Sequence, residues 1–211
     1  ANDMTFSNDG TLTLGTSGGT QTYNGGLSTS NVGGTVTLNG SFITSNDVVF
    51  IGNVTLGSAT TIDTNATNAT GDITLGTVTG SNSLSLSTGD NIANADISIS
   101  AISNLGALTF TDVGGSIQIG GNISATTFSA NNTVASIGLT GSSNTFSGAA
   151  TFANDVNLTL GDNASDAFTF GGGLTVTTAG TVELSGVISS TNDAISFGAI
   201  TLGGNTTIDT N

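Results

Sequence analysis

The segment Gly34–Asn65 reads GTVTLNGSFITSNDVVFIGNVTLGSATTIDTN, and it returns at Gly180–Asn211 as GTVELSGVISSTNDAISFGAITLGGNTTIDTN. The offset between the two copies is 146 residues. A second pair of segments has the same offset: FSNDGTLTLG at Phe6–Gly15 and FANDVNLTLG at Phe152–Gly161. Between the two pairs the offset slips by one residue and recovers, which indicates loops whose length changes are compensated. Self-similarity at a fixed spacing is typical of repeat architectures.

A shorter repeat lies inside the long one. Its signature is an apolar, a polar and an apolar residue, usually followed by Gly or another small residue. The first apolar position is Leu12, Val36, Val54, Ile73, Ile97, Ile117, Ile137, Leu158, Val182 and Ile200, and the second is Leu14, Leu38, Leu56, Leu75, Ile99, Ile119, Leu139, Leu160, Leu184 and Leu202. Successive second positions are 24, 18, 19, 24, 20, 20 and 21 residues apart, so the pattern predicts seven short repeats in each long one. We therefore expect residues 1–211 to form one continuous segment, with a super-repeat at about 6–151 and a partial second copy at 152–211.

This alternation is typical of β-strands, whose side chains point in turn to the core and to solvent. One strand every ~21 residues, recurring in register, is what the turn of a solenoid requires. The sequence thus predicts an all-β parallel β-helix, or β-solenoid, of about ten coils of ~18–24 residues. The twenty aliphatic residues are expected to point inward and to stack in two adjacent ladders. The remaining apolar residues, including most of the ten phenylalanines, are assigned to one or two further strands of each coil.

The charge balance and the short apolar runs exclude several classes of function. The chain has fourteen acidic residues, a net charge of −14, and no Lys, Arg, His, Cys or Pro. Binding to nucleic acid is not expected, because phosphate contacts need Lys or Arg. Membrane insertion is not expected either, because no apolar run approaches ~18 residues. Catalysis is not expected, because a paired-carboxylate mechanism for glycosides is the one chemistry left and no carboxylate pair stands out.

The coil signature resembles a known family. It reads TLTLG, NVTLG, DITLG, NLTLG and AITLG at residues 11–15, 53–57, 72–76, 157–161 and 199–203, with Gly-rich corners between the copies. These motifs are similar to the haemagglutinin-type and autotransporter-associated β-strand repeats of giant secreted bacterial adhesins. The resemblance implies a right-handed parallel β-helix that is exported to the cell surface.

One run of oxygen-bearing side chains is a candidate calcium site. The candidate ligands are Asp63, Asn65, Asn68 and Asp72, and Asp209 with Asn211 begin the equivalent turn of the second copy. Calcium binds six to eight hard oxygen ligands, so such a cluster would suit it. The other interpretation is structural, since Asp and Asn favour turns by bonding to their own backbone. We expect no other cofactor.

The function expected from these patterns is mechanical. The chain is expected to be a structural segment of an extracellular filament, stalk or giant surface adhesin that acts as a rigid repetitive rod. It would continue, covalently or by self-assembly, into further identical repeats, because no cap is visible and open strand edges template more pairing. The alternative is a binding module that recognises a glycan, a cell surface or Ca²⁺ along one solenoid face. A Thr-rich face could also suit ice, but Gln118, Gly138 and Glu183 interrupt it.

Overall fold

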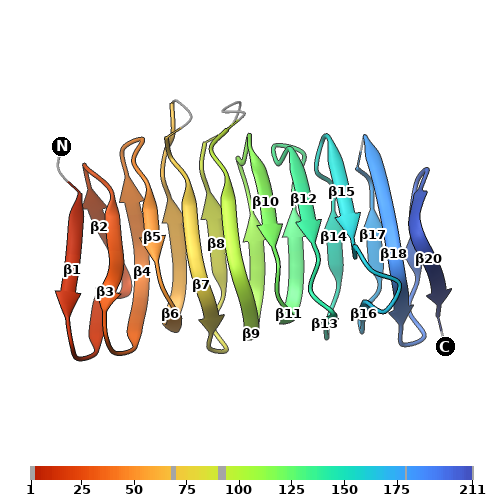
Figure 1. Cartoon of the computed structure of the whole chain (residues 1–211), viewed down its shortest axis with the longest axis horizontal. Helices are drawn as coiled ribbons and strands as arrows, with labels where there is room; N and C mark the ends of the chain where they lie inside the picture. The colour runs from red at the N-terminus through yellow and green to blue at the C-terminus, as the bar shows by residue number, and fades with distance from the viewer. Residues whose placement is uncertain (1–2, 68–69, 90–93, 179, 211) are drawn as a thin grey trace.

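The computed structural model describes residues 3–67, 70–89, 94–178 and 180–210. They form one parallel β-solenoid of about nine turns, close to the ten expected, with the termini at opposite ends of its long axis (Figure 1). Every strand pairing is parallel, and the described residues contain no helix. The strands are β1 (Met4–Asn8), β2 (Leu12–Tyr23), β3 (Leu27–Val32), β4 (Val36–Thr44), β5 (Val49–Ile51), β6 (Val54–Asp63), β7 (Ile73–Thr79), β8 (Leu84–Ser87), β9 (Ile97–Phe110), β10 (Ser116–Ile119), β11 (Ile123–Ala130), β12 (Ser136–Leu139), β13 (Ser143–Phe146), β14 (Ala150–Phe152), β15 (Asn157–Leu160), β16 (Ala167–Phe170), β17 (Leu174–Val176), β18 (Thr181–Ser190), β19 (Ile195–Ser196) and β20 (Thr201–Asp209).

Each turn has three strand segments, which stack into three faces. The first face holds β1, β3, β5, β10, β12 and β15 and the opening segments of β7, β9, β18 and β20. The second face holds β13, β16, the opening segments of β2, β4, β6 and β11, the middle of β9 and the closing segments of β7, β18 and β20. The third face holds β8, β14, β17, β19 and the closing segments of β2, β4, β6, β9 and β11. The chain visits the faces in this order in every turn.

The inward orientation of the aliphatic residues is confirmed. All of the twenty positions are buried except three: Leu12 is half-buried, and Ile200 and Leu202 are exposed in the last turn. The third face adds most of the aromatic core, in which Phe42, Phe110 and Phe152 are fully buried. These side chains form one continuous hydrophobic cluster along the rod. Burying apolar surface contributes about 25 cal/mol per Å², so this cluster is the main favourable term in folding.

The expectation that the twenty residues form two unbroken ladders is wrong at one point. Val54 pairs with Val78 in the next turn, whereas Ile73 pairs with Val49 of the preceding turn. The row of equivalent residues therefore leaves the second face after Val54 and resumes on the first face at Ile73. Both positions are buried, because an inward-pointing aliphatic residue suits either face equally well.

The count of seven turns in the long repeat is corrected for the same reason. Leu12 lies on the second face, and six turns above it the ladder reaches Asn144. From Asn144 the chain passes along the third face and then reaches Leu158, the counterpart of Leu12, on the first face. The offset is therefore two thirds of a turn more than six turns. The 146-residue offset thus spans about 32 Å of rod instead of the 34 Å that seven turns would give, at ~4.8 Å per turn. Equivalent motifs are rotated by one face.

Local backbone conformation nevertheless repeats at the same offset. Gly40 and Gly186 turn corners with φ of 83° and 89°, and Asn46 and Asn192 follow with φ of 71° and 61°. A Cβ atom on Gly40 would lie 2.3 Å from the carbonyl oxygen of Gly19, so only glycine fits this corner. The repeat therefore determines the shape of each corner, and the register between turns determines which face that corner joins.

Candidate binding surface

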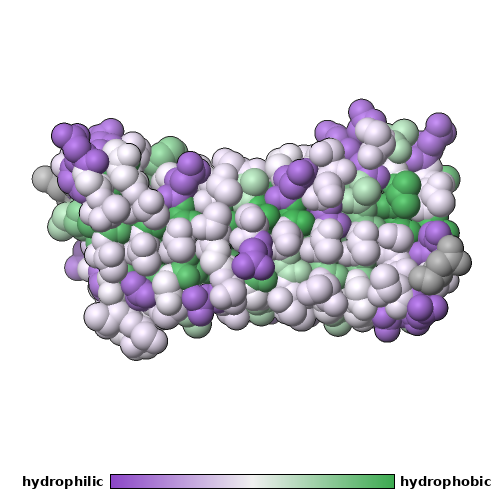
Figure 2. Space-filling model, turned by 90° about the horizontal axis from the view of Figure 1, so that it is seen from below, coloured by the Kyte–Doolittle hydropathy of each residue, from purple (hydrophilic) through white to green (hydrophobic). Residues whose placement is uncertain are grey.

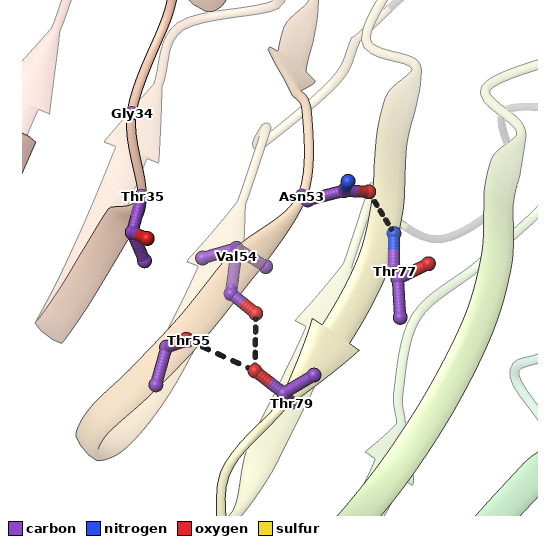
Figure 3. Close-up of a pocket in the computed structure, with 7 residues that line it drawn as sticks. All are labelled: Gly34, Thr35, Asn53, Val54, Thr55, Thr77 and Thr79. Carbon is purple, nitrogen blue, oxygen red and sulfur yellow. Dashed lines mark hydrogen bonds between the residues drawn. The ribbon is translucent and has the colours of Figure 1, made fainter. Parts of the chain in front are cut away.

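An open groove of about 440 Å³ lies across the corner between the first and second faces (Figure 3). Its walls are Gly34, Thr35, Asn53, Val54, Thr55, Thr77 and Thr79. These residues come from three successive turns, and β7 contributes two of them. The groove lies where the row of aliphatic residues changes face, between Val54 and Val78. Sequence reasoning missed it, because the register between turns is not visible in the sequence.

Hydrogen bonds between turns engage some of the polar atoms in the groove. The hydroxyls of Thr55 and Thr79 are 3.0 Å apart, and the Thr79 hydroxyl also donates to the carbonyl oxygen of Val54 at 3.1 Å. The amide of Thr77 donates to Oδ1 of Asn53 at 2.9 Å. None of the seven lining residues has a titratable side chain. The groove therefore offers hydroxyl and amide groups for a neutral polar ligand and no acid or base for catalysis.

The calcium candidate falls on a loop whose base is closed by a buried threonine. The Thr64 hydroxyl, fully buried, donates to the carbonyl oxygen of Gly71 at 2.6 Å, so Asp63 and Asp72 flank a closed loop. Asp63 accepts the amide of Asn65 at 2.8 Å in a local turn, and Asn65 has φ of 44°. Asn68 lies outside the described residues. The described residues hold no group of three or more His, Cys, Asp or Glu side chains placed to bind a metal, and the calcium site stays a prediction.

Closure of a loop by a buried hydroxyl recurs along the rod. Thr44 donates to the carbonyl oxygen of Asp47 at 2.6 Å, and Thr88 donates to that of Ala95 at 3.0 Å. Ser190, the counterpart of Thr44 in the second copy, donates to the carbonyl oxygen of Asp193 at 2.5 Å. These loops differ in length while their bases stay the same. The same hydrogen bond therefore closes the base of a short loop, from Thr44 to Asp47, and of a longer one, from Thr64 to Gly71.

The side chain of Asp72 also bonds to the backbone of the next turn, and three other Asp and Asn side chains make the same kind of bond. Oδ1 of Asp72 accepts the amide of Asp96 in the next turn at 2.9 Å, and Oδ1 of Asp96 accepts the amide of Ser116 at 2.6 Å. Asn53 and Asn122 make the same contact, to Thr77 at 2.9 Å and to Ser143 at 3.0 Å. In all four cases the side chain satisfies a backbone N–H at a corner, which would otherwise be unpaired there. The sequence carries a signal for this role that was not used: an Asp or Asn directly before the first aliphatic residue of a strand.

The outer surface is mostly weakly polar. Figure 2 shows hydrophilic residues gathered mainly toward the two ends and a discontinuous band of hydrophobic residues along the rod. Two exposed apolar residues, Val48 (44%) and Phe50 (43%), point outward at β5 on the first face, where Phe50 pairs with Ser28 and Thr74. Phe50 lies in a strand, but its ring is on the solvent side of that strand.

No protein-family model, curated protein or solved structure matches this chain. The class of the protein therefore comes from its own geometry: it is a parallel β-solenoid repeat protein. Within the part of the chain that the structure describes, no helix is long and apolar enough to cross a membrane.

Proposed function

We propose that this chain is a structural segment of an extracellular filament, stalk or giant surface adhesin, in which it acts as a rigid repetitive rod without catalytic activity. The observation that carries the proposal is the single hydrophobic core that runs through all the turns, from Leu14 to Ile188. Globular binding domains have a core of limited extent, whereas a solenoid core extends with each added turn. Each repeat of this sequence pattern therefore adds length to the protein along one axis.

The contacts between turns support a mechanical role. Parallel backbone ladders on three faces hold each turn to the next, and side chains such as Asp96 add bonds at the corners. All charged side chains are acidic, so neighbouring rods repel one another sideways. Repulsion of this kind favours contacts along the axis, and we propose that the segment continues into identical repeats, covalently or by self-assembly.

The adhesin family that the coil signature resembles is part of the same proposal, as is location at the cell surface. Antibodies raised against the folded 211-residue chain provide the test. They should label intact cells of the source organism, and immunogold particles should lie on fibres that project from the surface. Labelling that appears only after the cells are permeabilised would contradict the surface location and the filament role together.

The second candidate is a binding module, and two observations favour it: the hydroxyl-lined groove at Thr55 and Thr79, and the exposed ring of Phe50. Ligand sites commonly combine aromatic side chains with a small number of polar groups such as Thr hydroxyls. Binding to neutral glycans on an array, lost on replacing Phe50 by Ala, would favour the module over the rod. Binding of Ca²⁺ by the module is tested separately by calorimetric titration of the chain and of its Asp63→Asn variant, with Mg²⁺ as the control ion.

A further inference from the structure

A row of hydroxyl groups follows the second face from turn to turn. Its members are the outward residues that directly follow the first inward residue of each strand segment on this face. Each pairs in register with the next, except at one bulge between Ser103 and Ser124, and none of them is buried. This hydroxyl row consists of Thr13, Thr37, Thr55, Thr79, Ser103, Ser124, Thr145, Thr169 and Ser189.

The hydroxyl row is not visible in the sequence, because it joins residues that hold different places in the repeat. The row changes to a new part of the repeat where Thr55 pairs with Thr79. The three residues that interrupt the Thr positions of the sequence motif, Gln118, Gly138 and Glu183, all lie on the first face. The interruption therefore belongs to the first face, and the second face carries a hydroxyl group in nine successive turns.

The groove described above includes part of the hydroxyl row. Thr55 and Thr79 line it on the second face, and Thr35, Asn53 and Thr77 line it along the corner (Figure 3). Both sets of residues follow the rod axis from one turn to the next. A ligand that lies in the groove along the axis is therefore directed onto the rest of the hydroxyl row.

Charge and hydrogen-bonding capacity indicate the class of ligand. The hydroxyl row holds no charged side chain, while the whole chain has a net charge of −14 and no Lys, Arg or His. An anionic polymer would be repelled and would find no cation to pair with. A hydroxyl group both donates and accepts hydrogen bonds, as the hydroxyls of a neutral sugar do. The hydroxyls of Thr37, Ser124 and Thr145 make no hydrogen bond within the part of the chain that the structure describes, so they are available to such a ligand.

The spacing of the hydroxyl row suits an extended sugar chain. Successive turns rise by ~4.8 Å, which is about the length of one sugar unit in an extended β-linked chain. A single neutral hydrogen bond contributes little net free energy, because it replaces hydrogen bonds to water. Contacts in several turns must therefore act together, which a linear polymer achieves and a single sugar does not.

We propose that the groove and the hydroxyl row form one binding site for a linear, uncharged polysaccharide, which lies along the rod axis on the second face. The proposal rests on the binding-module candidate and specifies the form and the course of its ligand. The third face offers an internal comparison. It also has an outward row of Ser and Thr residues, in which Ser129 lies between Thr109 and Thr151, but none of the residues that line the groove comes from this face.

Calorimetric titration with β-linked oligosaccharides of glucose, of mannose and of N-acetylglucosamine tests the proposal. Each series has lengths of about two, four and six sugar units, and the longest spans ~29 Å, or about six turns. A two-unit ligand fits within the groove, whereas a six-unit ligand that begins there reaches Thr145, which lies three turns beyond Thr79. The variants are Thr145→Glu on the hydroxyl row and Ser129→Glu on the third face. Both sites are exposed, and circular dichroism checks that each variant is folded.

In at least one series the six-unit ligand should bind about tenfold tighter than the two-unit ligand, because it engages more turns at once. Thr145→Glu should weaken binding of the six-unit ligand about fivefold and leave the two-unit ligand unchanged, and Ser129→Glu should change neither. Affinity that does not depend on length, or equal losses in the two variants, would overturn the course along the second face and leave a binding module standing. Absence of binding in all three series would overturn the polysaccharide site and the binding module together, while the cell-surface labelling experiment would still test the rod.

Discussion

The aromatic core at the middle of the rod gives the sharpest test of the packing. Phe128 is 1% exposed on the third face, between Leu108 below and Ala150 above. Its ring centroid lies 4.3 Å from that of Phe152, in a stacked arrangement, and 5.6 Å from that of Phe110. Because the side chain of Ala150 is small, it leaves room for the large ring of Phe128 in the turn below. Replacing Phe128 by Ala therefore opens a cavity that the stacked backbone cannot close.

The expected loss follows from this geometry. A buried Phe→Ala change costs about 3–5 kcal/mol, depending on how far the site can relax. The loss at Phe128 should lie in the upper part of this range, because aromatic pairs add about 0.5–1.5 kcal/mol beyond buried area. Phe50→Ala is the matched control: the same atoms are removed from a ring that is 43% exposed. Its loss should be about 1 kcal/mol or less.

Urea unfolding measures the difference. With a slope of about 3 kcal/mol/M, Phe128→Ala should lower the midpoint by about 1.3–1.7 M and Phe50→Ala by about 0.3 M or less. Circular dichroism should be read together with the fluorescence of Tyr23, the only tyrosine in a chain without tryptophan. The two probes test whether unfolding stays cooperative, since each turn contacts only its neighbours. Losses that agree within about 0.5 kcal/mol for the two variants would refute the assignment of the third face as core.

Three further predictions test the register between turns, the inward and outward orientation of side chains, and the burial of Tyr23. Cysteines at Thr55 and Thr79 should form a disulfide under mild oxidation, because these residues pair in adjacent turns; a faster disulfide between Thr55 and Thr74 would reject the observed register. Leu56→Asp should cost more than about 4 kcal/mol in a thermal or urea melt and Thr55→Asp about 1 kcal/mol or less, because the first buries an unpaired charge; equal losses would contradict the inward and outward assignment. Burial raises the pKa of Tyr23 above its ordinary value near 10, so this contribution to stability is present below that value and is lost as the pH rises through the folded-state pKa; ultraviolet titration of the phenol should show a higher midpoint in the native chain than in urea, and the reverse order would contradict the burial.

Part of the candidate surface could be anticipated from the sequence, and part could not. The sequence predicts that the run from Asp63 to Asp72 is rich in oxygen-bearing side chains, but its closure by Thr64 depends on a buried hydroxyl that the sequence does not distinguish from any other. The groove at Thr55 and Thr79 could not be predicted at all. It is formed by residues 24 positions apart that meet only because of how the turns stack.

The alternation of apolar and polar residues determined by itself that the chain forms β-strands, because strand geometry sends every second side chain inward, and the recurrence of that pattern about every 21 residues determined that the strands form a solenoid. Glycine at Gly40 and Gly186 likewise determined two corners locally, through backbone conformations that other residues avoid. Only the tertiary structure decided that Val54 stacks on Val78 and that the long repeat advances by one face. The physical reason is that a buried aliphatic side chain is equally stable on any of three similar faces, so the choice among them depends on loop lengths summed over the whole turn.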